Sequence, residues 1–206
     1  MTATSPLATK RPSPSDRRGP FGWLWRQFCA LYLGLGGWKV EGDWPAPHKA
    51  VLIAAPHTSN WDGMWMLAAA GFYRIKLRWI GKQALVDHPF GWLIRWLGCV
   101  PVDRKAARDM VDQMAVAFAQ EDRLILAVAP EGTRSATREW KSGFYRIARR
   151  ADVPLIISVL DYGARTIRIA GIYETTGDYE ADLAGVRAYY SGAKGRYAEK
   201  FDMTER

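Results

Sequence analysis

The sequence is poor in the residues that build disulfide scaffolds and metal sites. Its 206 residues include only two cysteines, Cys29 and Cys99, and neither has a second cysteine at the spacing of a zinc-ligand pair. A disulfide framework and a thiolate zinc site are therefore not expected, and a reducing compartment is the default. The three histidines, His48, His57 and His88, also form no close ligand pair. We therefore expect no metal site.

The chain also lacks a long uninterrupted apolar run and a cleavable signal peptide. Its most apolar stretch, residues 21–38, contains Arg26, Gln27 and interior glycines, whereas about 20 uninterrupted apolar residues are needed to span a bilayer. No small-residue cleavage site follows this stretch. We therefore expect a membrane-interfacial or re-entrant helix over 21–38, and a helix packed on the core of its own domain is the alternative.

The chain does contain enough apolar material for one folded domain. Hydrophobic residues make up 49% and charged residues 24% of the sequence, which is a globular composition, and the length does not call for two domains. Residues 1–20 hold four prolines and several basic residues without hydrophobic periodicity. We therefore predict a mobile basic tail over 1–20, the interfacial helix over 21–38 and a single folded domain over 39–206.

The charge and the tryptophan content suggest the class of partner. The formal net charge of +8 favours anionic partners: membrane surfaces, nucleic acids, acidic carrier proteins or phosphorylated substrates. The ten tryptophans suit a protein at a lipid–water boundary, although a tryptophan-rich core would also account for them.

Short apolar runs alternate with stretches of helical pattern from residue 51 onward. The predicted strands cover residues 51–55, 77–80, 99–102, 124–129, 155–160 and 166–170. The predicted helices cover residues 61–71, 89–97, 105–120 and 139–150. This alternation predicts a single α/β domain with a mixed, largely parallel sheet flanked by helices. Such sheets carry their chemistry at the carboxyl ends of the strands.

The segment HTSNWD, residues 57–62, directly follows the first predicted strand and joins a proton acceptor to a carboxylate. On one continuous helix His57 and Asp62 would point about 140° apart. They can meet only if His57 lies in the loop and Asp62 in the first helical turn, with Ser59 or Asn60 as the N-cap. The carboxylate could then fix the imidazole tautomer and leave the other ring nitrogen as a general base. For this pair alone, an ordinary loop hydrogen bond is the alternative.

A second polar segment, PEGTRS at residues 130–135, follows the predicted strand 124–129. Gly132 permits a tight turn, while the Arg134 guanidinium and the Thr133 hydroxyl suit the capture of a phosphate. Glu131 could hold Arg134 in place or bind a substrate hydroxyl. Two polar segments at strand ends suggest one site. Because no serine or cysteine nucleophile is placed beside His57, its proton would come from a substrate hydroxyl that attacks an activated acyl group.

Two further blocks accompany these segments in a fixed order. Residues 81–104 carry Gly-Lys, Gly-Trp, Gly and Val-Asp-Arg in succession, and residues 153–156 read VPLI. Together the four blocks resemble those of the glycerophospholipid acyltransferase family, which includes bacterial 1-acylglycerol-3-phosphate acyltransferases. The resemblance covers about residues 38–170. The fourth block departs from the pattern, because Ser158 stands where the family often has a second proline.

The resemblance implies a role for each matching residue. His57 would be the general base on the acceptor hydroxyl, Asp62 would orient it, and Pro154 would border the acyl site. The residues implied in binding the acceptor are Arg104, Glu131, Gly132, Thr133 and Arg134. Residues 39–206 would then be an acyltransferase domain of phospholipid biosynthesis. It would move an acyl group from acyl-coenzyme A (acyl-CoA) or an acyl carrier protein to a lysophospholipid-like acceptor, with 1-acylglycerol-3-phosphate as the first candidate, and would need no metal or redox cofactor.

The implied partners are a membrane lipid acceptor, the acyl donor and an anionic membrane surface, on the cytoplasmic face of the inner membrane, with the protein peripheral or monotopic. A lyso-lipid without glycerol or phosphate, such as a lyso-aminolipid, is the alternative acceptor. A basic nucleic-acid-binding protein is a different class, but the aromatic residues cluster in apolar stretches, as Trp23 and Trp25 do, rather than between basic residues. A lipid-binding protein without catalysis is a third class, and the presence of both His57 and Asp62 argues against it.

Overall fold

The computed structural model describes residues 19–102, 107–137 and 139–201. The strands are β1 Lys39–Glu41, β2 Lys49–Ala55, β3 Leu77–Lys82, β4 Cys99–Val102, β5 Leu124–Val128, β6 Leu155–Asp161 and β7 Thr166–Tyr173. The helices in these residues are α1 Gly19–Leu35, α2 Asn60–Phe72, α3 Gly91–Trp96, α4 Ala107–Gln120, α5 Gly143–Ala151 and α6 Tyr179–Ala188, with short 3-10 turns η1 Gln83–Leu85 and η2 Ala198–Lys200. Of the predicted tail over 1–20, residues 1–18 lie outside the described residues.

The strands form one seven-stranded sheet in the order β1-β7-β6-β2-β5-β3-β4. Neighbouring strands from β6 through β4 are parallel, whereas β6 and β7 form an antiparallel hairpin and β1 runs parallel to β7. The carboxyl ends of β6, β2, β5, β3 and β4 therefore lie side by side at one end of the strands. We call this side of the sheet the carboxyl edge; it runs across the strands and is not an edge strand. Sheets of this kind bind their ligands there.

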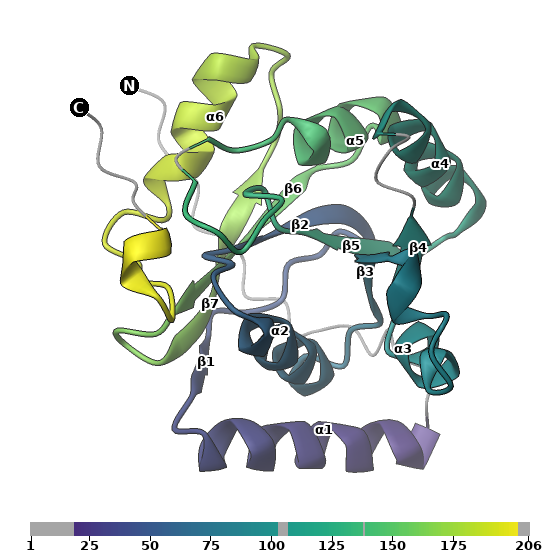
Figure 1. The fold of residues 1–206 in the computed structure, drawn as a ribbon, viewed down its shortest axis with the longest axis vertical. Helices are drawn as coiled ribbons and strands as arrows, with labels where there is room; N and C mark the ends of the chain where they lie inside the picture. The colour runs from purple at the N-terminus through teal and green to yellow at the C-terminus, as the bar shows by residue number, and fades with distance from the viewer. Residues whose placement is uncertain (1–18, 103–106, 138, 202–206) are drawn as a thin grey trace.

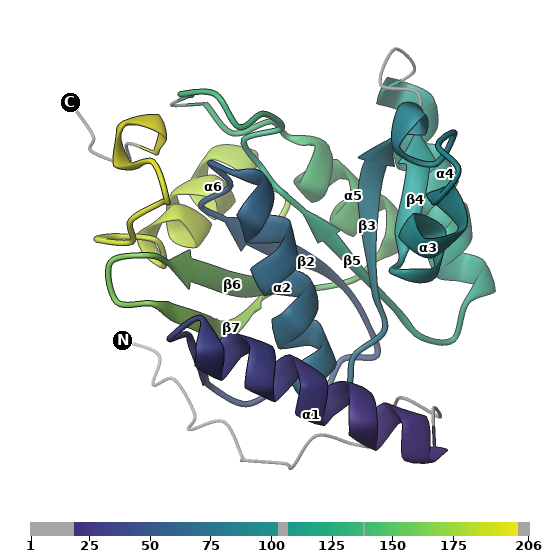
Figure 2. The ribbon, with the colours of Figure 1, turned by 60° about the horizontal axis from the view of Figure 1, so that its bottom comes forward.

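Helices cover both faces of the sheet (Figure 1). α4, α5 and α6 lie on one face, while α2 lies on the other with α1 packed across its outer side (Figure 2). Strand β2 sits between these layers. Its consecutive residues Val51, Leu52 and Ile53 are buried alternately against the two faces. The continuous apolar run in the sequence follows from this, since a strand covered on both faces has no polar side.

Only one face of α1 packs against α2. Cys29 and Leu33 are buried there, and the approach is so close that a side chain at Gly71 of α2 would collide with Cys29. The opposite face carries a row of exposed apolar side chains three or four residues apart. This outer stripe consists of Phe21, Leu24, Phe28, Leu31 and Leu35. Residues 21–38 thus pack on the domain with one face and present the other to the surroundings. Among the described helices, none has the length and apolar character required to cross a bilayer.

The predicted fold class is confirmed as a single α/β domain with a mixed, mostly parallel sheet flanked by helices. All the predicted strands and helices after residue 50 are present, with ends shifted by a few residues. Strand β1 and helix α6 were not predicted. The three residues of β1 are too few to show periodicity. Helix α6 begins with a recognisable N-cap, since the Asp178 carboxylate accepts a hydrogen bond from the Ala181 N–H, but few apolar residues mark its buried face.

Candidate active site

The corner between β2 and α2 carries His57 and Asp62. Strand β2 ends at Ala55, and α2 begins at Asn60 with Ser59 as its N-cap. His57 therefore lies in the loop and Asp62 is the third residue of the helix. The Asp62 carboxylate accepts a hydrogen bond from the Ser59 N–H at 2.7 Å, which ties the first helical turn to the loop. The geometry predicted from the spacing of the pair is confirmed.

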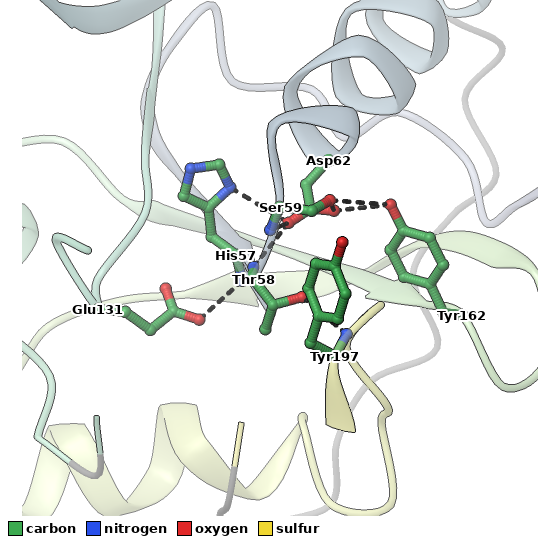
Figure 3. A network of polar contacts seen from close by, with 7 residues as sticks. All are labelled: His57, Thr58, Ser59, Asp62, Glu131, Tyr162 and Tyr197. Atoms are coloured by element: carbon green, nitrogen blue, oxygen red, sulfur yellow. Dashed lines mark hydrogen bonds and ion pairs between the residues drawn. The ribbon is translucent and has the colours of Figure 1, made fainter. Parts of the chain in front are cut away.

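The Asp62 carboxylate is buried and surrounded by donors (Figure 3). Its Oδ2 accepts hydrogen bonds from the backbone N–H groups of Thr58, at 2.6 Å, and Ser59. Its Oδ1 accepts from the hydroxyls of Ser59, at 2.5 Å, and Tyr162, at 2.7 Å. Burial alone would raise its pKa, but the His57 imidazole and the hydroxyls of Ser59 and Tyr162 outweigh burial and hold the pKa of this carboxyl below its ordinary value. Asp62 is therefore ionised at neutral pH.

The His57 imidazole turns Nδ1 toward this carboxylate. Nδ1 lies 3.5 Å from Oδ2 of Asp62, a length common for catalytic hydrogen bonds in proteins without substrate. The His57 side chain is 30% exposed and that of Asp62 only 3%. The imidazole ring is therefore accessible from solvent, whereas the carboxylate is shielded from it. With Nδ1 directed at a carboxylate, Nε2 is the nitrogen that can accept a proton.

Glu131 joins the second polar segment to the first. It follows β5, the neighbour of β2, and its Oε1 accepts a hydrogen bond from the backbone N–H of His57 at 2.9 Å. Burial is the main cause that raises the pKa of this carboxyl. Its buried Oε2 has no hydrogen-bond partner within the described part of the chain. Glu131 thus fixes the loop that carries His57 through Oε1, rather than holding Arg134.

The turn after Glu131 carries polar side chains that are partly or fully exposed. Gly132 has a φ of 61°, which suits glycine, and Cδ of Lys141 would lie 2.7 Å from a Cβ at this position. The Thr133 hydroxyl accepts a hydrogen bond from the Ser135 N–H at 3.1 Å, and Arg134 is exposed. Lys141 lies over Gly132, so the turn that follows Glu131 carries two cationic side chains, Arg134 and Lys141.

Two other predicted site residues are not placed here. Arg104 lies outside the described residues, and β4 ends just before it at Val102 on the carboxyl edge. Pro154 precedes β6, and its carbonyl accepts a hydrogen bond from the Val51 N–H near the start of β2. Its place is therefore the opposite edge of the sheet, roughly 20 Å from His57 along β2. The assignment of Pro154 to the acyl site stays a prediction that this position does not support.

Two tyrosines at the site were missed by the sequence analysis. Tyr162 lies in the β6–β7 hairpin and donates to Asp62, 100 residues earlier in the chain. Tyr197 lies in the segment after α6, and its N–H donates to the Thr58 hydroxyl at 3.3 Å. The position of Tyr162 at the site could have been predicted, because it follows a predicted strand of the parallel sheet and so belongs to the carboxyl edge. No sequence feature indicated the position of Tyr197, since no strand directly precedes it.

A half-exposed imidazole backed by a buried carboxylate, beside a turn with exposed cations, is a site that can activate a hydroxyl close to an anionic group. The acyltransferase family model matches residues 37–160, more than half of the chain. The chain therefore belongs to the acyltransferase family, and the resemblance seen in its motifs is confirmed.

Curated relatives and a solved structure agree with this membership. The chain is 36% identical over 142 residues to a probable 1-acyl-sn-glycerol-3-phosphate acyltransferase of Mycoplasma pneumoniae and 33% identical over 144 residues to one of Mycoplasma genitalium. Each match covers 63% of this chain and 52% of the relative, so the chain spans about half the length of these relatives. The crystal structure of the 1-acyl-sn-glycerophosphate acyltransferase PlsC from Thermotoga maritima shares the fold, with a TM-score of 0.55 at 17% identity over 83% of this chain and 77% of that one.

Proposed function

We propose that the protein transfers a fatty acyl group from an acyl-CoA or acyl carrier protein thioester to a hydroxyl of a lysophospholipid, with 1-acylglycerol-3-phosphate as the first candidate. The observation that carries the proposal is the partly exposed His57 ring, backed by the buried Asp62 and placed on the same edge as Arg134. The names of the Mycoplasma relatives support the choice of acceptor. Membership in an enzyme family also favours this reaction over the nucleic-acid-binding alternative.

The geometry supports direct attack by the acceptor rather than an acyl-enzyme. The Ser59 hydroxyl, in the same loop as His57, is buried and donates its hydrogen bond to Asp62, so it is not positioned as a nucleophile. Nε2 of His57 would take the proton of the acceptor hydroxyl while its oxygen attacks the thioester carbonyl. Collapse of the tetrahedral intermediate breaks the carbon–sulfur bond, and the imidazolium returns the proton to the departing thiolate. Asp62 stabilises the imidazolium between these steps.

The proposed reaction calls for no metal or redox cofactor. Each proton in the scheme moves between the acceptor hydroxyl, His57 and the thiolate, so the scheme balances without a further reactant.

A direct assay tests the proposal. The purified protein would be incubated with 1-acylglycerol-3-phosphate and either acyl-CoA or acyl carrier protein thioester, and the lipids would be analysed by mass spectrometry. We expect diacylglycerol-3-phosphate and free thiol in equal amounts. Release of thiol without an acylated lipid would show a thioesterase and contradict the proposal.

Replacing Arg134 with alanine should raise the KM for a phosphorylated acceptor by about tenfold or more, since a charge-assisted hydrogen bond contributes roughly 1.5–3 kcal/mol. Steady-state kinetics with varied acceptor concentration measure this. Arg123→Ala is the matched control, because Arg123 is exposed just before β5 at the opposite edge of the sheet. An unchanged KM in the Arg134 variant would point instead to a non-phosphorylated acceptor, such as a lyso-aminolipid.

We further propose that the protein works as a peripheral protein on the cytoplasmic face of the inner membrane, with the outer stripe of α1 against the lipid. Exchanging Leu24 and Phe28 for glutamate should reduce binding to anionic liposomes at least ~10-fold, because each side chain contributes roughly 1.5–3 kcal/mol when buried. Liposome sedimentation measures the bound fraction. Gln27→Glu places a negative charge on the same helix outside the stripe and serves as control. Full binding by the double variant would contradict the membrane role of α1.

A further inference from the structure

The two oxygens of the Asp62 carboxylate have separate partners. Oδ2 faces Nδ1 of His57 and accepts the two backbone hydrogen bonds of the loop. Oδ1 is turned away from the imidazole and accepts from the hydroxyls of Ser59 and Tyr162. Ser59 belongs to the same loop and helix start as Asp62, so its contact is local. Tyr162 comes from a different part of the sheet and supplies the one donor that ties this carboxylate to the β6–β7 hairpin.

Tyr162 is itself held from two sides. Its backbone N–H donates to the Lys194 carbonyl at 2.9 Å. Its ring meets the ring of Trp38 edge to face, with centroids 4.8 Å apart and planes at 87°. Trp38 packs in turn against Trp65 of α2 at 5.2 Å. The backbone hydrogen bond and the ring contact hold the phenol in a position from which its hydroxyl can fix the plane of the Asp62 carboxylate.

The hydroxyl acts as a donor and not as an acid. Burial, together with the Asp62 carboxylate beside it, raises the pKa of Tyr162 to about 12. The phenol therefore keeps its proton at neutral pH, and that proton is directed at Oδ1 of Asp62.

We propose that Tyr162 is a positioning residue of the catalytic pair: its hydroxyl orients the Asp62 carboxylate so that Oδ2 faces His57, and it withdraws negative charge toward Oδ1. This inference rests on the proposed function only for its effect on turnover. Its effect on the titration of His57 follows from the contacts alone. Without the hydroxyl, more negative charge resides on Oδ2, and the imidazolium form of His57 is favoured over the neutral form.

Other charged groups around the pair remain in place when Tyr162 is changed. Glu131 accepts from the His57 N–H. The Arg196 guanidinium lies 5.7 Å from the ring centre of Trp61, and its charge also acts on the Tyr162 hydroxyl. Neither residue is touched by Tyr162→Phe, which removes one oxygen and keeps the ring against Trp38. A changed titration therefore reports the lost hydrogen bond.

For Tyr162→Phe we expect kcat to fall about tenfold, which corresponds to one charge-assisted hydrogen bond. The KM for the acceptor should stay within about twofold, because Tyr162 is not proposed to touch the acceptor. The acid limb of the kcat/KM profile should move to higher pH. Tyr73→Phe is the matched control, since that buried hydroxyl donates to the carbonyls of Glu41 and Gly42, away from the site. The control should lose stability but keep the pH profile.

The decisive measurement is an NMR titration of the imidazole C2 protons in the wild-type and Tyr162→Phe proteins, with the His57 signal assigned from a His57→Gln variant. We expect the His57 midpoint to lie at higher pH in Tyr162→Phe and to be unchanged in Tyr73→Phe. An unchanged His57 midpoint in Tyr162→Phe would overturn the inference, even in an active enzyme. A raised midpoint in a protein that transfers no acyl group would uphold the contact and overturn the proposed function instead.

Discussion

Replacing His57 with alanine is expected to lower kcat for acyl transfer at least ~10²-fold, the low end for the loss of a general base. The fold should survive, because the imidazole is 30% exposed and the hydrogen bond to Glu131 uses the backbone N–H, which alanine retains. Rates measured at saturating concentrations of both substrates report the effect. A urea unfolding curve of the same protein shows whether the structure is intact.

His48→Ala is the matched control for this variant. His48 is exposed just before β2, at the edge of the sheet opposite to His57, so its loss removes an imidazole without touching the site. Wild-type turnover is expected in the control. Wild-type turnover in the His57→Ala protein would contradict the assignment of His57 as the base.

Replacing Asp62 with asparagine should lower kcat roughly 10²-fold while preserving the loop. An amide oxygen in the place of Oδ2 can still accept the N–H groups of Thr58 and Ser59. The amide nitrogen would then face the hydroxyls of Ser59 and Tyr162, which can rotate to accept. What the variant loses is the negative charge that stabilises the imidazolium.

The pH dependence of kcat/KM distinguishes the loss of this charge from a distortion of the loop. Since the pKa of Asp62 is held below its ordinary value, the carboxylate is ionised over the whole working range. Without that charge the neutral imidazole persists to lower pH, so the acid limb of the kcat/KM profile should move down in Asp62→Asn. This is the opposite direction to Tyr162→Phe. Asp112→Asn, on the exposed face of α4, provides the control, and an unmoved limb in Asp62→Asn would show that the charge does not act on His57.

The sequence predicted the parts of this molecule that depend on neighbouring residues. The His57–Asp62 geometry followed from the spacing of the pair and from a capping residue, because one strand end, one loop and one helical turn decide it. The meeting of this loop with Glu131 followed from the rule that parallel strands place their carboxyl ends together. The alternation of apolar runs with helical patterns predicted helices on both faces of the sheet. A strand such as β2 must carry apolar residues on both of its sides when helices cover both faces of the sheet.

Contacts that depend on the order of the strands could not be predicted from the sequence. The hydrogen bond from Tyr162 to Asp62 depends on the order of the strands, which places β6 beside β2, and periodicity does not report that order. The assignment of Pro154 to the acyl site stays a prediction. It came from a motif, whereas a residue that precedes a parallel strand lies at the opposite end of the strands from His57. The role of Glu131 as the partner of a backbone N–H could not be predicted either, because motif matching concerns side chains.

The aromatic packing around Trp38 places a limit on how this chain can be dissected. The ring of Tyr32 in α1 packs against Trp65, Trp65 packs against Trp38, and Trp38 meets Tyr162 edge to face. Tyr162 in turn donates to Asp62. A chain shortened to begin at residue 39 would lose two of these rings along with the outer stripe, and would leave Trp65 and Tyr162 unsupported. A loss of activity in such a truncated protein could come from poor attachment to lipid or from a misaligned Asp62 carboxylate, and the two causes could not be separated. Substitutions confined to the outward-facing side of α1 test membrane attachment without disturbing the aromatic contacts that support Tyr162 and Asp62.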